Sequence, residues 1–302
     1  MVSVIITSYN EPGTIGRAIN AFLKQKRYFS ELIVVSPDKK TIDFAEEYKK
    51  KYPFIKIVKD KGEGKPEAVN LGIKKTNSEI IVLSDGDVYA AENSLKYLLN
   101  PLKNKEFGCV TGRPVSLNSR KNLFGFWAYM LTENFHKIRK LKSAQNKEIT
   151  ASGYLYAVRK NLMPVIPKQA LADDAYVSSY IAAHNKSIAY AESAKVFVNY
   201  PANLRDWISQ KKRTAGRIYQ QKSFSGKINE LTDELIVSIT SISEIKSLKE
   251  FFWFLALGVM RSYIWFRIFL DRRLWKRDFS KVWQRVESTK HINQLSDKKR
   301  YG

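Results

Sequence analysis

The chain has 302 residues, of which 44% are hydrophobic and 13% aromatic, so its composition excludes global disorder and suffices for a packed core. Its single cysteine, Cys109, cannot form an internal disulfide, and its three scattered histidines predict no zinc site. The net charge of +23 predicts a polyanionic partner, either nucleic acid, an anionic membrane surface or an anionic substrate such as a nucleotide diphosphate. A solvated basic surface without such a partner remains the alternative.

The lone cysteine also indicates a reducing compartment. The first residues, 2–7, run directly into an apolar strand, with no basic leader and no small-residue cleavage site. From these two features we expect the protein to be made and kept in the cytoplasm.

Apolar runs alternate with helical patterns through the first hundred residues, which is typical of repeated βαβ units. We expect strands over 2–7, 32–36, 55–59, 80–83 and near 108–111, and helices over about 14–26, 41–51, 92–102 and after the turn at 62–66. The fold class is therefore α/β, with a mostly parallel central sheet flanked by helices.

The middle of the chain is less regular. An aromatic-rich helix is expected over 121–141, where core packing accounts for most of the rings, and a strand with a glycine bend over 150–159. A helix over 172–184 opens with Asp173 and Asp174, which suit the positive end of a helix dipole.

The composition changes after Pro201. A basic helix, a polar connector over 222–232 and an aromatic, basic last stretch follow. We therefore divide the chain into an α/β domain, 1–220, and a helical, membrane-associating C-terminal region, 221–302.

Residues 251–270 form a long apolar segment interrupted by Arg261 and Arg267. Each central arginine costs about 2.5–3.5 kcal/mol in a spanning helix, which disfavours a simple membrane span. Tryptophans and further basic residues around the segment favour a helix that lies in the headgroup layer of an anionic membrane. A buried core helix of the catalytic domain is the alternative.

The most informative motif is Asp85-Gly86-Asp87, which directly follows the apolar strand 80–83. A buried parallel strand delivers such residues to its C-terminal edge, where open α/β sheets bind ligands. Two carboxylates one residue apart suit Mn²⁺ or Mg²⁺, which typically bridges protein carboxylates and substrate phosphates. An Asp-Gly turn that merely closes the strand is the alternative.

Further polar motifs follow in a fixed order along the chain. They are Thr7-Ser8-Tyr9-Asn10-Glu11 after the first strand, Asp38 after the second, Gly64-Lys65, Asp85 and Asp87, Gly153, Asp173-Asp174 and Gln210-Lys211-Lys212-Arg213. This order over about residues 1–217 resembles the family 2 glycosyltransferases of the GT-A fold. The resemblance implies an inverting, metal-dependent transfer of a sugar from a UDP- or GDP-sugar to a lipid-linked or glycan acceptor at the cytoplasmic membrane face.

The resemblance also implies roles for individual residues. It assigns nucleotide binding to Thr7, Tyr9, Asn10, Glu11, Asp38, Lys65 and Asp85. Asp87, helped by Asp85, would hold Mn²⁺ or Mg²⁺. At Asp38 the chain departs from the family pattern, because Ser36-Pro37-Asp38 replaces a run of acidic and small residues.

The acidic pair occupies the position of the family's catalytic motif. Asp174 would act as the general base on the acceptor hydroxyl, beside Asp173. Gly153, Gln210 and Arg213 would contact the acceptor or the diphosphate. Thr214 stands where the polymerising branch of the family has a tryptophan, which weakens an assignment to processive synthesis.

Two other functions compete with this interpretation. Nucleotidyltransferases share a similar architecture, but they usually carry a Gly-x-Gly-Thr-Arg segment where this chain has Ser8-Tyr9-Asn10-Glu11. A nucleic-acid-binding protein would fit the net charge, yet the chain lacks a compact basic motif with stacking residues. We therefore expect no nucleic-acid partner.

Overall fold

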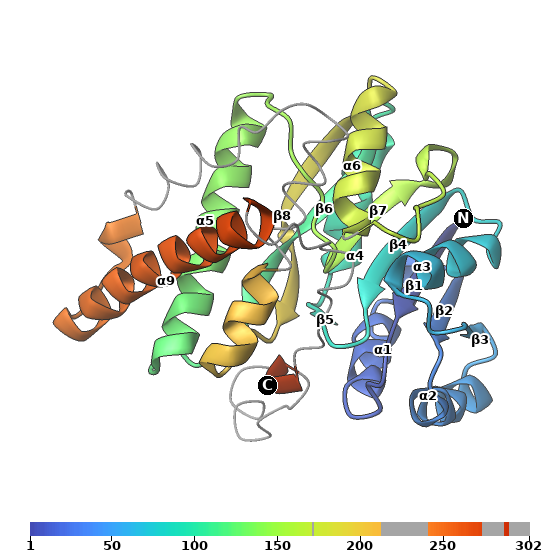
Figure 1. The fold of residues 1–302 in the computed structure, drawn as a ribbon. Coiled ribbons are helices and arrows are strands. Elements are labelled where there is room, and N and C mark those ends of the chain that lie inside the picture. Colours follow the sequence, from blue (N-terminus) through green and yellow to red (C-terminus); the bar gives the residue numbers. More distant parts are fainter. Residues whose placement is uncertain (171, 213–240, 274–286, 290–302) are drawn as a thin grey trace.

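The computed structural model describes residues 1–170, 172–212, 241–273 and 287–289. Its first part alternates strands and helices as the sequence predicts (Figure 1). The elements are β1 (Val2–Thr7), α1 (Ile15–Leu23), β2 (Glu31–Ser36), α2 (Lys39–Lys51), β3 (Ile55–Lys59), α3 (Lys65–Lys74) and β4 (Ile80–Asp85).

The later elements are longer and less evenly spaced. They are β5 (Tyr89–Ala90), α4 (Ser94–Leu99), β6 (Phe107–Ser116), α5 (Leu123–Ala144), β7 (Leu155–Arg159), α6 (Asp173–Ala183), β8 (Ser187–Val198) and α9 (Leu248–Arg273), together with a helix over 204–212. The strand expected over 150–159 is present only over β7, and the helix expected over 92–102 shortens to α4 and a 3-10 turn at Pro101–Lys103. Neither β5 nor β8 is predicted from the sequence.

One eight-stranded sheet, in the order β3-β2-β1-β4-β7-β6-β8-β5, forms the centre of the molecule. The pairs β1–β2, β1–β4, β2–β3 and β6–β8 are parallel, whereas β4–β7, β6–β7 and β5–β8 are antiparallel. The predicted mostly parallel sheet is therefore correct for the first half, and the second half is mixed. Because β1, β2, β4 and β6 run the same way, their carboxyl ends share one edge.

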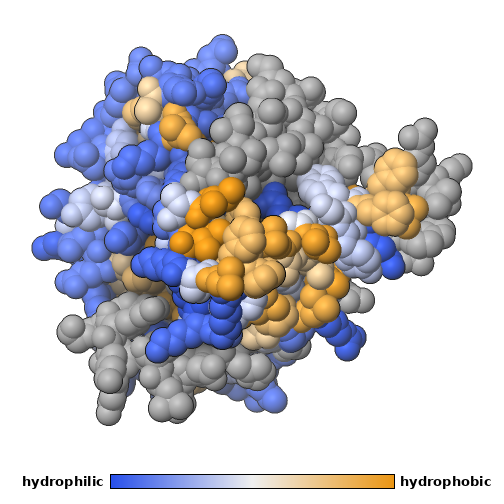
Figure 2. Space-filling model, turned by 90° about the vertical axis from the view of Figure 1, so that its left-hand side faces the viewer, coloured by the Kyte–Doolittle hydropathy of each residue, from blue (hydrophilic) through white to orange (hydrophobic). Residues whose placement is uncertain are grey.

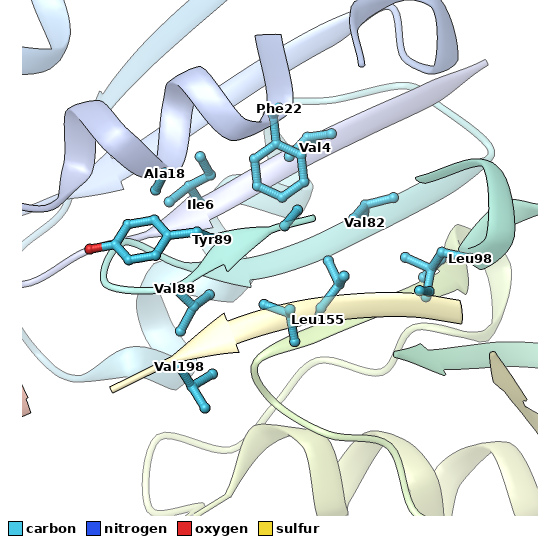
Figure 3. Packing of buried hydrophobic residues seen from close by; sticks show 14 of the residues in the cluster. Val4, Ile6, Ala18, Phe22, Val82, Val88, Tyr89, Leu98, Leu155 and Val198 are labelled. Atoms are coloured by element: carbon cyan, nitrogen blue, oxygen red, sulfur yellow. The ribbon is translucent and has the colours of Figure 1, made fainter. Parts of the chain in front are cut away.

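Two hydrophobic clusters cover the two faces of this sheet. On one face Val4 and Val82 pack with Phe22 of α1 (Figure 3), and this cluster continues to Trp127 of α5 and Ile268 of α9. On the other face α3 and α6 cover the sheet, and their buried residues include Val69 and Ile181. Burial on both faces explains the continuous apolar runs of β1, β2 and β4.

The aromatic residues of α5 pack in the core, as the sequence analysis expects for most of them. The Trp127 ring lies 5.2 Å from that of Trp207 in the helix 204–212, and the Trp127 indole donates to the backbone carbonyl of Trp253 at 2.7 Å. Phe124 joins the same cluster. These contacts attach both the helix 204–212 and α9 to α5.

The α9 helix crosses α5 (Figure 1) and buries only a narrow strip of its surface. Over Leu248–Leu270, three residues are buried: Leu257, Ile264 and Ile268. By length and composition this helix also suffices to cross a membrane. Because most of its residues are exposed, the alternative of a buried core helix is wrong for α9, although Leu257, Ile264 and Ile268 pack in the main core cluster.

Candidate active site

The carboxyl ends of β1 and β4 place the first site residues next to each other. Thr7 and Asp85 are partners in the parallel register, and the Thr7 hydroxyl donates to Asp85 Oδ1 at 3.5 Å. The backbone N–H of Gly86 donates to the Thr7 carbonyl at 2.9 Å, which extends the pairing by one residue. The predicted position of the acidic motif at the C-terminal edge of the sheet is thus present in the structure.

Gly86 lets the acidic motif lie directly against the turn after β1. A Cβ atom at this position would lie 2.5 Å from Ser8 Oγ and 2.6 Å from Glu11 Oε2. Those two atoms belong to a hydrogen bond of 2.7 Å, donated by the Ser8 hydroxyl to the buried Glu11 carboxylate. A side chain between Asp85 and Asp87 would therefore have to displace Ser8 or Glu11.

Asp38 ties the turn after β1 to the start of α2. Its Oδ2 accepts from the backbone N–H of Asn10 at 2.6 Å and from the Ser36 hydroxyl at 2.9 Å, while Oδ1 caps the helix at the N–H of Thr41. Burial raises the pKa of Asp38, but these hydrogen bonds outweigh burial and hold the pKa below its ordinary value. Asn10 itself adopts a left-handed backbone with φ of 54°.

Lys65 joins the acidic motif to the acidic pair. Its ammonium lies 2.7 Å from Asp85 Oδ1 and 3.5 Å from Asp173 Oδ1, at the N-terminal end of α3. Burial lowers the pKa of Lys65, but the charges of Asp173 and Asp85 outweigh burial and raise the pKa above its ordinary value. Lys65 is therefore not a solvated lysine at a helix start, because two carboxylates pair with its ammonium.

The acidic pair opens α6 and is buried. Asp174 accepts from the backbone N–H of Gly153 at 2.7 Å through Oδ2 and from that of Ala175 at 2.8 Å through Oδ1. Asp173 Oδ2 is buried without a hydrogen-bond partner in the described part of the chain. Burial raises the pKa of Asp173, Lys65 lowers it and the charge of Asp174 raises it further, so the net direction is upward.

The remaining predicted site residues are Tyr9, Asp87, Gln210 and Arg213. Tyr9 is about half exposed beside Asn10, and Asp87 is partly exposed two residues beyond Asp85. Gln210 is buried on the helix 204–212, which Trp207 attaches to the aromatic cluster. Arg213 lies outside the described residues.

Sequence reasoning missed several side chains that hold this site together. Ser8 and Thr41 fix Glu11, since the Thr41 hydroxyl accepts from the Glu11 backbone N–H at 2.9 Å. The Tyr156 hydroxyl is buried without a partner in the described ranges, and its pKa is raised by burial and by the nearby charge of Asp173. In the sequence, the signal for this residue was a tyrosine within the apolar run 155–158.

The donor set fits a divalent cation that is only partly enclosed by protein. In the described part of the chain, no group of three or more His, Cys, Asp or Glu side chains converges to hold a metal ion. Asp85 and Asp87 offer carboxylate oxygens one residue apart. The negative charges of the carboxylates in this cluster exceed the positive charge of the Lys65 ammonium. Mg²⁺ and similar hard ions commonly take one or two protein carboxylates and complete their shell with phosphates and water.

A mixed sheet with acidic residues at the carboxyl ends of its parallel strands and an acidic pair at the start of α6 agrees with the GT-A fold. The chain matches glycosyl transferase family 2 over residues 3–162, more than half of its length, and it belongs to that family.

Curated relatives share the sequence pattern over most of this chain. A probable glycosyltransferase, YdaM of Bacillus subtilis, is 27% identical over 255 residues, which cover 78% of this chain and 60% of that protein. The poly-beta-1,6-N-acetyl-D-glucosamine synthase of Staphylococcus epidermidis is 22% identical, over 71% of this chain and 53% of that protein. The chain thus spans between half and two thirds of the length of these relatives.

Solved structures share the fold at low sequence identity. The mannosyltransferase PcManGT from Pyrobaculum calidifontis, in complex with GDP-Man and Mn²⁺, matches with a TM-score of 0.64 and 18% identity, over 92% of this chain and 88% of that one. Glucosyl-3-phosphoglycerate synthase from Mycobacterium tuberculosis, with Mn²⁺ and UDP-glucose, has a TM-score of 0.54 and 15% identity, over 76% and 80% of the two chains. The predicted GT-A fold is confirmed.

Proposed function

We propose that this chain is an inverting glycosyltransferase, which moves a sugar from a UDP- or GDP-sugar to a lipid-linked or glycan acceptor at the cytoplasmic face of a membrane. The observation that carries the proposal is the convergence of Asp85, Lys65 and the acidic pair at one edge of the sheet. Residues 1–220 form the catalytic domain in this proposal, and 221–302 the C-terminal region.

The nucleotide binds at the turns after β1 and β2. Tyr9, Asn10 and Glu11 line the first turn, and Asp38 holds that turn through the Asn10 backbone. A carboxylate oxygen can accept more than one hydrogen bond, so Asp38 can contact the base while it caps α2. Thr7 and Asp85 form the floor beneath the ribose and the diphosphate.

Asp87, helped by Asp85, would hold Mn²⁺ or Mg²⁺, which would supply positive charge to stabilise the departing diphosphate. The similar PcManGT and glucosyl-3-phosphoglycerate synthase complexes contain Mn²⁺, which supports this choice. Lys65 adds a second positive charge beside Asp85, within reach of the same phosphates. Gln210 and Arg213 stand as further diphosphate or acceptor contacts.

Asp174 is the general base. The acceptor oxygen attacks the anomeric carbon and transfers its proton to Asp174, while the bond to the diphosphate breaks and the nucleoside diphosphate leaves. The N–H groups of Gly153 and Ala175 hold the carboxylate of Asp174 in one orientation. A single displacement of this kind inverts the anomeric configuration.

A donor screen tests this function. Thermal unfolding is followed with UDP- and GDP-sugars, each with and without Mn²⁺ or Mg²⁺, because a ligand that binds the native state raises its melting temperature. A metal-dependent rise with one nucleotide is expected. Stabilisation by oligonucleotides, with none from any nucleotide sugar, would contradict the proposal and favour the nucleic-acid-binding alternative.

The outer face of α9 is the proposed membrane contact. It exposes large apolar residues along one side of the helix, seen as the orange patch in Figure 2. These residues are Phe251, Phe252, Leu255, Val259, Tyr263, Phe266 and Phe269. We place α9 flat in the headgroup layer, because its inner side packs on α5 and Arg261 and Arg267 are partly exposed near anionic lipid.

Vesicle flotation tests this contact. Phosphatidylcholine vesicles with and without phosphatidylglycerol are compared, and the wild-type protein should float with the anionic vesicles. Val259→Glu places a charge in the middle of the exposed face, where 71% of the valine is accessible, and should abolish flotation. Val165→Glu is the control, since Val165 is 76% exposed outside α9; equal flotation of both variants would overturn the assignment.

A further inference from the structure

Asn70 on α3 forms a two-way hydrogen bond with the backbone of Ile166. Its Nδ2 donates to the Ile166 carbonyl at 2.8 Å, and its Oδ1 accepts from the Ile166 N–H at 3.0 Å. Ile166 lies in the connection 163–170, which has no regular secondary structure and leads to Asp173 at the start of α6. The carboxamide thus supplies both bonds that a neighbouring strand would otherwise give to this residue.

Asn118 makes the same pair of bonds to Tyr200. Its Nδ2 donates to the Tyr200 carbonyl at 2.9 Å, and its Oδ1 accepts from the Tyr200 N–H at 2.8 Å. The β6–β8 ladder ends at Ser116 and Val198, so the side chain of Asn118 continues it by a further step. The chain then enters the helix 204–212, which carries Gln210.

The two connections differ in their other contacts: Tyr200 also packs on Trp207 at 6.4 Å, whereas a second polar contact of the connection 163–170 is exposed. Near Ile166, the salt bridge between Lys168 and Glu63 measures 3.1 Å, but its side chains are 58% and 44% exposed. Exposed pairs of this kind contribute about 0–1 kcal/mol, whereas Asn70 is buried. The buried amide is therefore the stronger tie between the connection and the sheet half that binds the nucleotide.

We propose that Asn70 and Asn118 are positioning residues, which set the placement of Asp174 and Gln210 relative to the donor. This inference rests on the proposed function of those two residues. A displacement of about 1 Å at a reacting group can cost about 10²-fold in rate, so a single lost amide bond in either connection should act on turnover. Binding of the donor to the β1 and β2 turns should persist.

Gln25 provides a matched control. Its Nε2 donates to the Ala91 carbonyl at 3.1 Å, and its Oε1 accepts from the Leu95 N–H at 2.9 Å, so it also brackets a backbone segment. That segment leads into α4, which carries none of the candidate site residues. Gln25 is 2% exposed, which makes the loss of its amide at least as costly for folding.

The experiment replaces each amide by the isosteric acid: Asn70→Asp, Asn118→Asp and Gln25→Glu. A carboxylate still accepts from the backbone N–H but has no hydrogen to donate to the carbonyl. For Asn70→Asp we expect kcat to fall about 10²-fold with an unchanged KM for the donor. Gln25→Glu should lower the melting temperature by a similar amount without lowering kcat.

Hydrogen–deuterium exchange gives a second readout that does not depend on activity. Exchange should rise in peptides covering 163–170 for Asn70→Asp and 199–212 for Asn118→Asp, with no change in β1 to β4. Should Asn70→Asp not fold, Asn70→Ser removes the carboxamide without adding charge and serves the same test.

The outcomes separate this inference from the proposed function. The positioning role is wrong if Asn70→Asp has the same kcat as Gln25→Glu. It is also wrong if hydrogen–deuterium exchange in Asn70→Asp rises across the whole sheet. If the wild-type protein turns over no nucleoside-diphosphate sugar, the proposed function fails, and the exchange arm alone decides whether the amides hold these two connections.

Discussion

The two halves of the sheet place their site residues by different physical means. In residues 2–85, the site residues follow the ends of the parallel strands β1, β2 and β4, so the register of the sheet fixes them. In the second half, Asp174 and Gln210 stand after irregular connections, each of which is bracketed by the two hydrogen bonds of one asparagine side chain. We infer that the loss of one polar contact in the first half leaves the site residues in place. The loss of one such contact in the second half displaces them and lowers activity.

The largest effects are expected at Asp174, the proposed base, and at Asp87. Asp174→Asn keeps the side-chain shape and one acceptor for the Gly153 N–H, but it cannot take a proton at neutral pH. General-base catalysis contributes about 10²–10⁴-fold, so kcat should fall by about that factor while donor binding persists. Steady-state kinetics with the donor from the screen measures this change.

Asp87→Asn is the counterpart in the first half. It should leave the fold intact and abolish transfer by weakening the metal-dependent binding of the donor. Asp43→Asn is the control for both variants, because the side chain of Asp43 is 62% exposed on α2. Substantial transfer by Asp87→Asn or Asp174→Asn would contradict the role given to that residue.

Lys65 spans the boundary between the halves, so its removal tests whether they depend on each other. Lys65→Met leaves Asp85 and Asp173 without their shared ammonium, and breaking a buried ion pair from one side costs about 3–5 kcal/mol. Because 34% of the lysine side chain is exposed, we expect about 3 kcal/mol or less in the free energy of unfolding.

Urea denaturation measures the loss at Lys65. The matched control is Lys49→Met, which breaks an exposed pair with Glu46 on α2 and should cost about 0–1 kcal/mol. Equal losses in the two variants would mean that Lys65 does not join the acidic groups in solution.

The first half was predictable because its physics is local and repetitive. Continuous apolar runs predicted β1 and β3 at their observed bounds, and the parallel order then implied that Asp85 meets the turn after β1. The second half was not predictable in the same way. The strand β8 mixes buried and exposed positions irregularly and pairs with β6 across shifts near Gly108 and Gly112, so it shows no clean period.

Most contacts among the site residues could not be predicted from the sequence. The acidic pair was placed on the correct helix start, but the ion pair of Lys65 with Asp173 joins residues 108 positions apart and leaves no local pattern. The amide bonds of Asn70 and Asn118 are equally remote from their partners in sequence. Such contacts depend on tertiary packing, which composition and periodicity do not describe.

Gly86→Ala tests whether close packing against the turn after β1 helps to place the acidic motif in the first half. The added methyl would meet Ser8 and Glu11 at 2.5–2.6 Å, and overpacking of this kind costs about 1–3 kcal/mol. We expect a lower melting temperature and a higher KM for the donor. Gly13→Ala is the control, because a Cβ there meets nothing within 4 Å; a neutral Gly86→Ala would show that the turn after β1 adjusts freely.

The smallest effect concerns Asp38→Asn, at a residue whose position is fixed both by β2 and by its own hydrogen bonds. Asparagine still caps α2, but the hydrogen bonds from Asn10 and Ser36 then go to a neutral acceptor instead of a carboxylate. We expect this to lower the free energy of unfolding by about 1 kcal/mol at pH 7. The folded pKa of Asp38 lies below its ordinary value of 3.8, so its stabilisation is present above that pH and is lost as the pH falls through the folded pKa.

Urea denaturation of the wild type and Asp38→Asn between pH 7 and pH 3 checks this sign. The difference in free energy of unfolding should shrink toward acid, and a constant difference would mean that the charge of Asp38 is not what stabilises the turn. A rise in the KM for the donor at pH 7, beyond the rise that an equally destabilised Gln25→Glu shows, would add a direct nucleotide contact to this structural role. Because the strand already places Asp38, we expect both effects to stay well below those of Asp174→Asn.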